Sequence, residues 1–305
     1  MKDIKYEGVK ALTFTSIMSA ISLVFVLITF FVSGTGLFLI LVLPLIAALV
    51  ALKVNLKYSL IYIFATFAMS FIDFQNALFV ILPSLISGIL FGYLIKTEVQ
   101  GYYIIFLISV LNIGLQIGAT YLVKGIYQID LINVYSNVFH IKYEVFSSIY
   151  YLFLFVLSLI QTVITYIIMT NEIKKIGFVF NEKKNHYLWI LLTTLIFSLL
   201  SVILINFVPS LSYLFIGFSL YFGVVIGYYH FSYYQKKLVL IIQDVLYALS
   251  LLSMFVLMFT ISSNYKPLVL LLPVLGEFIM SIIVIIYSKI IKKEKLNSTV
   301  FEKKN

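Results

Sequence analysis

The chain of 305 residues has no cysteine and no arginine, and only 11% of its residues are charged. The absence of cysteine excludes disulfides and thiolate metal ligands. All 21 basic residues are lysines, a bias typical of an AT-rich bacterial genome rather than of a functional preference for Lys over Arg. A soluble domain has roughly 25% charged residues. This chain therefore has too little polar surface to cover a water-soluble globule.

Apolar residues make up 63% of the chain, and the mean hydropathy is +1.12. A helix needs about 20 predominantly apolar residues to cross the hydrocarbon core of a membrane. Apolar runs of suitable length predict an all-α, polytopic transmembrane helix bundle of ten spans. The expected spans are residues 10–32, 36–53, 57–73, 76–96, 101–124, 145–171, 187–207, 211–235, 238–262 and 267–291.

The positions of the lysines indicate how such a bundle is oriented. Loops on the cytoplasmic side of a membrane carry an excess of Lys and Arg. If the N-terminus is inside and all ten spans cross, only Lys124, Lys142 and Lys266 lie outside, and the other 18 of the 21 lysines lie inside. We therefore expect a multi-pass protein of the bacterial cytoplasmic membrane with its N-terminus and C-terminus in the cytoplasm.

A charged segment divides the expected spans into two groups. Residues 172–186 are predicted to form a cytoplasmic linker between a six-span membrane bundle in residues 1–171 and a four-span bundle with a basic tail in residues 187–305. The long outer loop, Gly125–Glu144, carries polar residues among apolar ones. We expect it either to lie on the membrane surface or to fold over an outward cavity.

Small residues recur at helical spacing in several spans, where they let helix backbones approach closely in lipid. The first span has Ala11, Thr15 and Ser19, with Ser16 and Ala20 beside them. This stripe either packs internally or docks a partner membrane protein, and its place at the cytoplasmic end makes it the best docking candidate. Stripes for which internal packing is the simpler interpretation are Ser84/Gly88/Gly92, Gly114/Gly118 and Gly223/Gly227.

Ionisable side chains at membrane depth are costly, so they tend to face a bundle interior or a cavity. Glu277 lies near the middle of the last span, after Pro273, which removes one backbone hydrogen bond, and Gly276. Its carboxyl group is expected to bind a cation, relay a proton or contact a substrate amine, or else to be a protonated group bonded to a neighbouring helix. Asp244 is either a second site residue or an interface residue, and Asp73 is expected to be a turn or cap residue.

Three amide side chains are further candidates for binding a substrate. Asn112 and Gln116 are spaced i and i+4 on the fifth span and therefore share one helix face. Gln161 lies in the middle of the sixth span. The three amides either converge on a small polar ligand inside the first bundle or pair with each other without one.

Catalytic and metal-binding motifs are weak. His140, His186 and His230 have no neighbour at the spacing of metal ligands. No Gly-rich phosphate loop and no recognisable nucleophile motif is present. We therefore expect no enzymatic activity, no cofactor, no metal and no nucleic-acid partner. The one contrary pattern is that His230 and Asp244 flank a turn, which would bring them together in a membrane-embedded lipid-modifying enzyme.

The layout of the chain resembles the YybS-like family of bacterial multi-pass membrane proteins, a family of unknown function. The likeness is carried by the opening and the first turns, by the end of the fourth span and by the acidic, then basic, tail. The residues concerned are Glu7–Leu12, Ser33–Gly36, Pro44, Lys53–Lys57, Gly88–Lys96, Leu275–Glu277 and Lys289–Lys293. Glu277 stands where an Asp is typical, and lysines stand where Arg is common.

The first six spans, residues 1–171, also resemble more distantly the substrate-binding S components of energy-coupling-factor transporters. That resemblance implies a solute site in the first bundle and docking of the Ala11, Thr15 and Ser19 stripe, with Ser16 and Ala20, on a coupling subunit. The four further spans depart from the S-component plan.

The leading hypothesis is a transport-related protein that binds or translocates a small solute. Its site would lie beneath the 125–144 loop and use Asn112, Gln116 and Gln161, while Glu277 and Asp244 serve a coupling or structural role. The alternative is a membrane scaffold or assembly factor for cell-envelope proteins, and a lipid-modifying enzyme is a third hypothesis. In each case the lipid bilayer is the principal partner.

Overall fold

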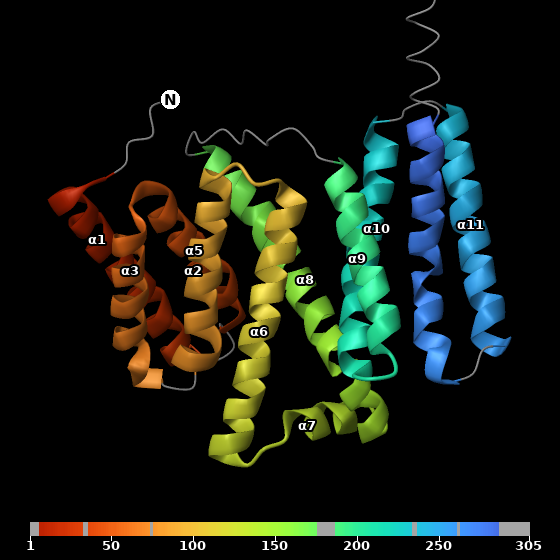
Figure 1. The fold of residues 1–305 in the computed structure, drawn as a ribbon. Helices are drawn as coiled ribbons and strands as arrows, with labels where there is room; N and C mark the ends of the chain where they lie inside the picture. Colours follow the sequence, from red (N-terminus) through yellow and green to blue (C-terminus); the bar gives the residue numbers. More distant parts are fainter. Residues whose placement is uncertain are drawn as a thin grey trace, which may run out of the picture. The chain divides into compact units, whose positions relative to one another are not determined.

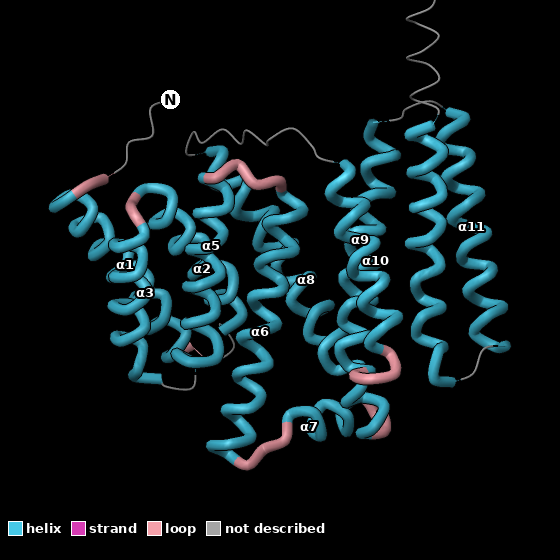
Figure 2. Tube along the Cα trace, in the orientation of Figure 1, coloured by secondary structure: helices cyan, strands magenta, loops and turns pink. Residues whose placement is uncertain are grey.

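A computed structural model describes residues 6–32, 36–73, 76–175, 187–233, 237–260 and 263–286 of the chain. All the secondary structure in these ranges is helical (Figures 1 and 2). The all-α prediction is therefore confirmed for this part of the chain. The predicted linker lies outside the described residues apart from 172–175, where α8 ends.

The chain divides into two compact units. Unit 1 contains Met1–Tyr143 and Phe153–Asn185, and unit 2 contains Glu144–Leu152 and His186–Asn305. Each unit has its own buried side chains.

Unit 1 is built from seven helices and two short helical turns among its described residues. A 3-10 turn, η1 (Ser70–Asp73), and a π-helical turn, η2 (Ala77–Ile81), stand between α3 and α5. The side chain of Asp73, predicted as a turn residue, lies outside the described part. The helices are α1 (Gly8–Phe31), α2 (Gly36–Lys53), α3 (Leu56–Met69), α5 (Leu82–Lys96), α6 (Gly101–Tyr127), α7 (Leu131–Val138) and most of α8 (Tyr143–Lys175).

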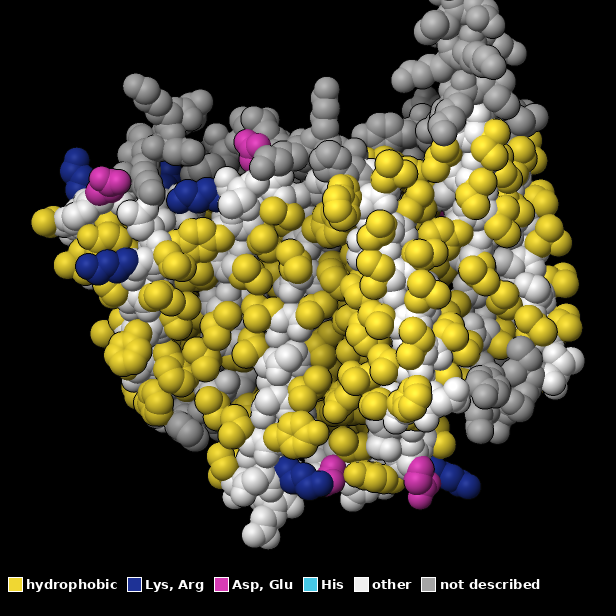
Figure 3. Space-filling model, viewed as in Figure 1, with side chains coloured by type: hydrophobic (Ala, Val, Ile, Leu, Met, Phe, Trp, Pro, Cys, Tyr) yellow, Lys and Arg dark blue, Asp and Glu magenta, His cyan; other side chains and the backbone are white. Residues whose placement is uncertain are grey.

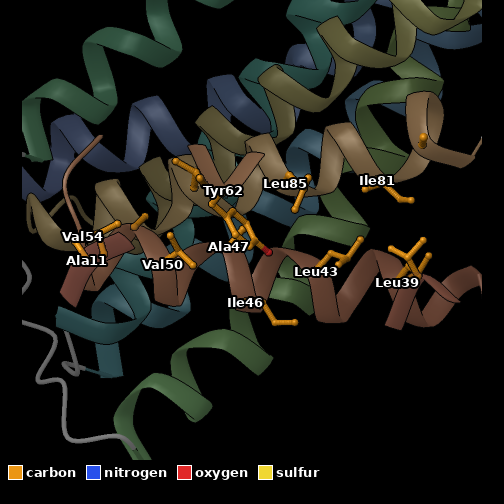
Figure 4. Packing of buried hydrophobic residues seen from close by; sticks show 14 residues of the cluster. Ala11, Leu39, Leu43, Ile46, Ala47, Val50, Val54, Tyr62, Ile81 and Leu85 are labelled. Atoms are coloured by element: carbon orange, nitrogen blue, oxygen red, sulfur yellow. The ribbon is translucent and has the colours of Figure 1, made fainter. Parts of the chain in front are cut away.

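Helices α2 and α5 of unit 1 pack closely against each other through glycine. A Cβ atom added at Gly88 would lie 2.4 Å from the carbonyl oxygen of Pro44, and one added at Gly92 would lie 2.5 Å from that of Ala48. Only glycine allows such an approach of two helix backbones. The core beside this contact is apolar, and in Figure 4 side chains of α1, α2 and α3 and of the η2–α5 segment gather in it.

The small-residue stripe of α1 is used inside unit 1. Ala11, Thr15 and Ser19 are at most 3% exposed, and α1 packs on α2 and α3. Of the two interpretations of this stripe, internal packing is the one that the burial of these three residues supports, because neighbouring helices cover them. Ser16 and Ala20, which point to another face of α1, are exposed.

A second stripe departs from expectation in the opposite direction. Gly114 and Gly118 of α6 are exposed, and a Cβ atom added at either would meet nothing within 4 Å. The expectation that this stripe packs internally is therefore wrong for the described structure. By contrast, the Gly88 stripe and the Gly223 and Gly227 pair of unit 2 lie against neighbouring helices, as expected.

The segment that follows α6 in unit 1 contains a short helix that the sequence did not reveal. Helix α7 begins after Asp130, whose Oδ1 accepts hydrogen bonds from the backbone N–H groups of Ile132 at 3.0 Å and Asn133 at 3.3 Å. This is an N-cap, which satisfies donors that have no partner inside the helix. The Oδ2 of Asp130 also accepts from Lys124 at 2.9 Å.

Unit 2 contains α9 (Tyr187–Leu204), α10 (Pro209–Tyr233), α11 (Lys237–Thr260), the 3-10 segment η3 (Ser263–Leu271) and a helical stretch over residues 272–286. Aromatic rings and serines join α9 to α10: Phe197 packs on Phe218, and Ser212 donates to the carbonyl of Ser201 at 2.7 Å. The last helix packs on α10, where Val274 lies 3.2 Å from the Cβ position of Gly223.

Seven of the described helices are long and apolar enough to cross a membrane. Three shorter apolar helices accompany them, over Leu39–Lys53, Leu56–Ile72 and Ile241–Leu257. On the face shown in Figure 3, hydrophobic side chains cover the length of the helices and charged side chains gather near the helix ends. The seven spans are Gly8–Phe31, Ala77–Lys96, Gly101–Tyr127, Tyr143–Lys175, Tyr187–Leu204, Pro209–His230 and Pro267–Ile286.

Candidate functional sites: two polar cavities

The three predicted amides meet at one cavity in unit 1. Asn112 and Gln116 come from α6, and Gln161 comes from α8. The cavity has a volume of about 130 Å³, and η2 and α5 complete its wall with Ser84 and Ser87 among other residues. We call it the amide cavity. The structure thus brings Gln161 to the same cavity as Asn112 and Gln116, which share one face of α6.

The amide cavity combines polar groups without charge. None of the described residues that line it is ionisable. The Gln116 Oε1 atom is buried and has no hydrogen-bond partner in the described structure, and the same holds for Thr162 Oγ1 in an adjoining crevice that shares Asn112 and Gln161. Buried polar atoms are costly when unpaired. The cavity therefore calls for a polar occupant, either water or a small solute.

A larger cavity lies in unit 2 between α10, α11 and the last helix. Its volume is about 480 Å³, within the range of roughly 300–1,000 Å³ found for small-molecule sites. Most of its wall is apolar or aromatic, and three polar side chains reach it: Gln243 and Asp244 from α11, and Glu277. We call it the carboxylate cavity.

Glu277 is tied to a buried histidine behind the cavity wall. The side chain of Glu277 is 8% exposed, and its Oε2 lies 3.2 Å from Nδ1 of His230, which is fully buried. On the other side of the imidazole ring, Nε2 lies 2.6 Å from the hydroxyl of Tyr187 and 3.4 Å from that of Ser281. A chain of polar contacts therefore runs from α9 through α10 to the last helix.

Glycine makes room for the second oxygen of the Glu277 carboxyl group. A Cβ atom added at Gly227 would lie 3.0 Å from Glu277 Oε1 and 3.5 Å from Gln243 Nε2. The Gln243 amide also donates to the Gly227 carbonyl at 3.2 Å. Gly227, Gln243 and Glu277 thus converge at one part of the cavity wall, which explains why a small residue stands at position 227.

His230 has a different partner from the one that the enzyme hypothesis required. That hypothesis needed His230 and Asp244 to meet across the turn between α10 and α11. In the structure His230 is buried in unit 2 and bonds to Glu277, whereas Asp244 is exposed and lines the cavity. The pairing with Glu277 joins residues 47 positions apart, and no local spacing signals such a contact.

The contacts of Ser281, His230 and Glu277 follow the order of a hydrolase triad, but the surroundings do not suit one. Ser281 is 1% exposed, and its hydroxyl donates to the Glu277 carbonyl at 2.7 Å. A nucleophile must reach its substrate, and the buried Ser281 hydroxyl does not suit that role.

In the part of the chain that the structure describes, no group of three His, Cys, Asp or Glu side chains could hold a metal ion.

Outside the membrane-spanning helices, Asp130 is the charged group with a marked environment. The hydrogen bond from Lys124 lowers the pKa of the Asp130 carboxyl group, and the backbone donors of the α7 N-cap act in the same direction. This favours the ionised form and fixes the chain where it leaves α6.

The fold and the apolar helices define an integral membrane protein. The family described as "Predicted membrane protein (DUF2232)" has a model that matches residues 20–151, which are almost entirely in unit 1. A search of curated proteins and a search of solved structures each gave no match. The matched region carries Asn112 and Gln116 and ends before Gln161, so it covers the α6 side of the amide cavity.

Proposed function

We propose that the protein is a transport-related membrane protein that binds a small, uncharged polar solute in the amide cavity. The observation that carries this proposal is the convergence of Asn112, Gln116 and Gln161 from α6 and α8 on one cavity with buried, unpaired polar atoms. Amide groups both donate and accept, so they suit a solute with hydroxyl or amide groups.

The size of the cavity limits the solute. A volume of about 130 Å³ corresponds to roughly four water molecules at about 30 Å³ each. A molecule the size of urea or glycerol fits this space, whereas a large cofactor does not. The absence of ionisable side chains from its described lining disfavours a charged solute, since a lone charge in such a site is costly.

The proposed topology places this cavity inside a first bundle of six spans. The seven candidate spans and the three shorter apolar helices correspond one to one with the ten predicted spans, which supports ten crossings in a six-plus-four arrangement. The lysine distribution then puts both termini in the cytoplasm. The likeness to S components and to the YybS-like family is consistent with this proposal and remains a prediction.

The binding proposal is tested with the purified full-length protein in nanodiscs. Small molecules released from it by denaturation are identified by mass spectrometry, and their effect on the melting temperature is measured together with that of urea and glycerol. A triple variant, Asn112→Ala, Gln116→Ala and Gln161→Ala, should lose both the released solute and the stabilisation by it. Equal binding by the variant and the wild type would refute the site.

The scaffold alternative has less support than it had from the sequence. Its docking stripe was to include Ala11, Thr15 and Ser19, and these residues are buried inside unit 1. A lipid-modifying enzyme built on His230 and Asp244 also loses its basis, because the imidazole bonds to Glu277 and lies away from any open surface. We therefore propose a binding role rather than a catalytic one.

A further inference from the structure

We propose that the carboxylate cavity of unit 2 is a second binding site, specific for an organic ammonium ion with an apolar body. This site differs from the amide cavity in its position, its size and its charge, so it goes beyond the proposed function. Its recognition group is the carboxyl group of Glu277, with Asp244 as a second acid.

The carboxylate cavity is lined by acidic and uncharged residues. Glu277 is 8% exposed in its side chain, and it lies in the middle of a helix that is long enough to cross the membrane. An ionisable residue at membrane depth marks a functional site by default, because it is costly to keep there. Glu277 and Asp244 both line the cavity, and none of the described lining residues is basic. The cavity is therefore suited to a positive charge.

The carboxyl group of Glu277 is held in place by neighbouring residues. His230 and Gly227 hold the carboxyl group from two sides: Oε2 bonds to Nδ1 of the imidazole, and Oε1 lies beside the glycine that forms part of the cavity wall. The imidazole is itself bonded to Tyr187 on its far nitrogen. The carboxyl group is thus fixed at the edge of the cavity before any ligand arrives, which reduces the cost of binding.

The apolar part of the cavity wall favours binding of an organic cation over binding of a metal ion. Leucine, valine and proline contribute five of the thirteen lining residues, and the aromatic rings of Tyr228 and Tyr247 stand on α10 and α11. Aromatic rings attract organic cations. Mg²⁺ and Ca²⁺ need about six or more oxygen ligands, and this wall offers two carboxyl groups and one amide among its side chains other than tyrosine.

The carboxylate cavity is accessible to a ligand. Val224, Tyr228 and Tyr247 line the cavity and are 71%, 70% and 46% exposed, so the cavity is open on this side of α10 and α11. An amphipathic amine can therefore enter with its ammonium group directed to Glu277 and its apolar body against the aromatic wall.

The test compares three molecules of similar shape and different charge. Phenethylammonium, 2-phenylethanol and phenylacetate are titrated into the full-length protein in nanodiscs, and binding is followed by calorimetry and by the melting temperature. Phenethylammonium alone should bind and stabilise. Glu277→Gln, which keeps the size of the side chain and its ability to hydrogen-bond to His230, should weaken its binding roughly tenfold or more. Asp244→Asn should weaken it less, because Asp244 is exposed.

Control variants separate this site from a general effect on the protein. Ala248→Leu, which fills the cavity from α11 without changing its charge, should abolish binding of phenethylammonium. The triple alanine variant of Asn112, Gln116 and Gln161 should bind it as the wild type does, so failure of the amide-cavity proposal leaves this result unaffected. Should Glu277→Gln not fold, Asp244→Asn and Ala248→Leu still decide the question.

Three outcomes would overturn the proposal. The first is equal binding of 2-phenylethanol and phenethylammonium, which would show that charge is not recognised. The second is that sodium chloride, at the same ionic strength, raises the melting temperature as much as the amine does, which would indicate that an inorganic cation suffices. The third is amine binding that is unchanged in both Asp244→Asn and Ala248→Leu.

Discussion

The two units bury polar groups in different ways. Unit 1 holds its helices together by close backbone contacts at Gly88 and Gly92, and its cavity is small and lined by amides and hydroxyls. Unit 2 buries a histidine and a glutamate that bond to each other, beside a cavity more than three times as large. The comparison indicates that packing in unit 1 depends on shape, whereas unit 2 depends on a polar network whose partners must all be present.

The largest effect should come from breaking the backbone contact of unit 1. Gly88→Leu should destabilise the protein by about 3 kcal/mol, because overpacking a tight contact forces the helices apart. A Cβ atom at this position would meet Pro44 at 2.4 Å. Thermal unfolding in detergent measures the change.

Gly118→Leu is the matched control for this substitution. A Cβ atom there meets nothing within 4 Å, so the effect should stay within about 0.5 kcal/mol. If both leucine variants unfold at the same temperature, the close contact between α2 and α5 does not contribute to the stability of the protein.

The next effect concerns the polar network of unit 2. His230→Ala should destabilise the protein by about 2 kcal/mol, because the carboxyl group of Glu277 and the hydroxyl of Tyr187 would lose a buried partner. Chemical denaturation in mixed micelles measures this loss. A change within experimental error would show that the network adds nothing to stability.

An exposed histidine provides the comparison. His140 has a positive φ of 54°, a conformation that asparagine tolerates well. His140→Asn should therefore leave stability unchanged within about 0.5 kcal/mol. The contrast between the two histidines separates a buried partner from a surface side chain.

A smaller effect is expected at the N-terminus of helix α7. Asp130→Ala should destabilise α7 by about 1 kcal/mol, because the helix loses its N-cap. Asp130→Asn keeps a capping oxygen and should lose only the contact with Lys124, which as an exposed ion pair contributes little. Hydrogen exchange of the α7 amides measures both changes, and equal protection in the alanine variant and the wild type would contradict the capping role.

The same residue predicts a dependence on pH. The pKa of Asp130 is lower in the folded protein than in the unfolded chain, chiefly because Lys124 donates a hydrogen bond to it. Its contribution is therefore present above the unfolded value of about 3.9 and is lost as the pH falls through the lower folded value. Protection of α7 should decrease on acidification, and Asp130→Asn should remove that decrease.

The smallest effect is expected on the exposed face of α1. Ser16→Leu and Ala20→Leu should each change stability by no more than about 0.5 kcal/mol, since both side chains are exposed. Ser19→Leu, which replaces a residue that is 3% exposed, should be clearly destabilising. Comparable melting temperatures for all three variants would show that α1 does not pack as described.

Local patterns predicted the helices, and they singled out three amides that line one cavity. Apolar runs of about 20 residues are determined by the thickness of the membrane, and the spacing of Asn112 and Gln116 determines a shared helix face. Spacing could not reveal which stripes of small residues pack internally, because Ala11 and Gly114 stand in similar patterns and only the first is covered.

Contacts between distant parts of the chain were beyond such patterns. Glu277 was singled out because an acid in an apolar span is rare. Its partner could not be chosen, because His230 and Asp244 are near each other in sequence while His230 and Glu277 meet only in the fold. The short helix α7 was also missed, although Asp130 is a good N-cap and the helix is amphipathic, because eight residues are too few for a helical period to stand out from the sequence.

In the proposed topology, the chain crosses the bilayer six times before residues 172–186 and four times after them. The absence of native cysteine makes it directly testable, because a single introduced cysteine is the only thiol. Three single-cysteine variants are expressed separately in bacteria: Lys142→Cys, Lys183→Cys and Ser298→Cys. The cells are prepared so that a reagent in the medium reaches the outer surface of the cytoplasmic membrane, and each variant is treated with a membrane-impermeant maleimide.

The account predicts that Lys142→Cys is labelled without permeabilisation, whereas Lys183→Cys and Ser298→Cys are labelled only after the membrane is opened. Labelling of Lys183→Cys from outside would contradict six crossings before this residue. Labelling of Ser298→Cys from outside, with Lys183→Cys protected, would contradict four crossings after it.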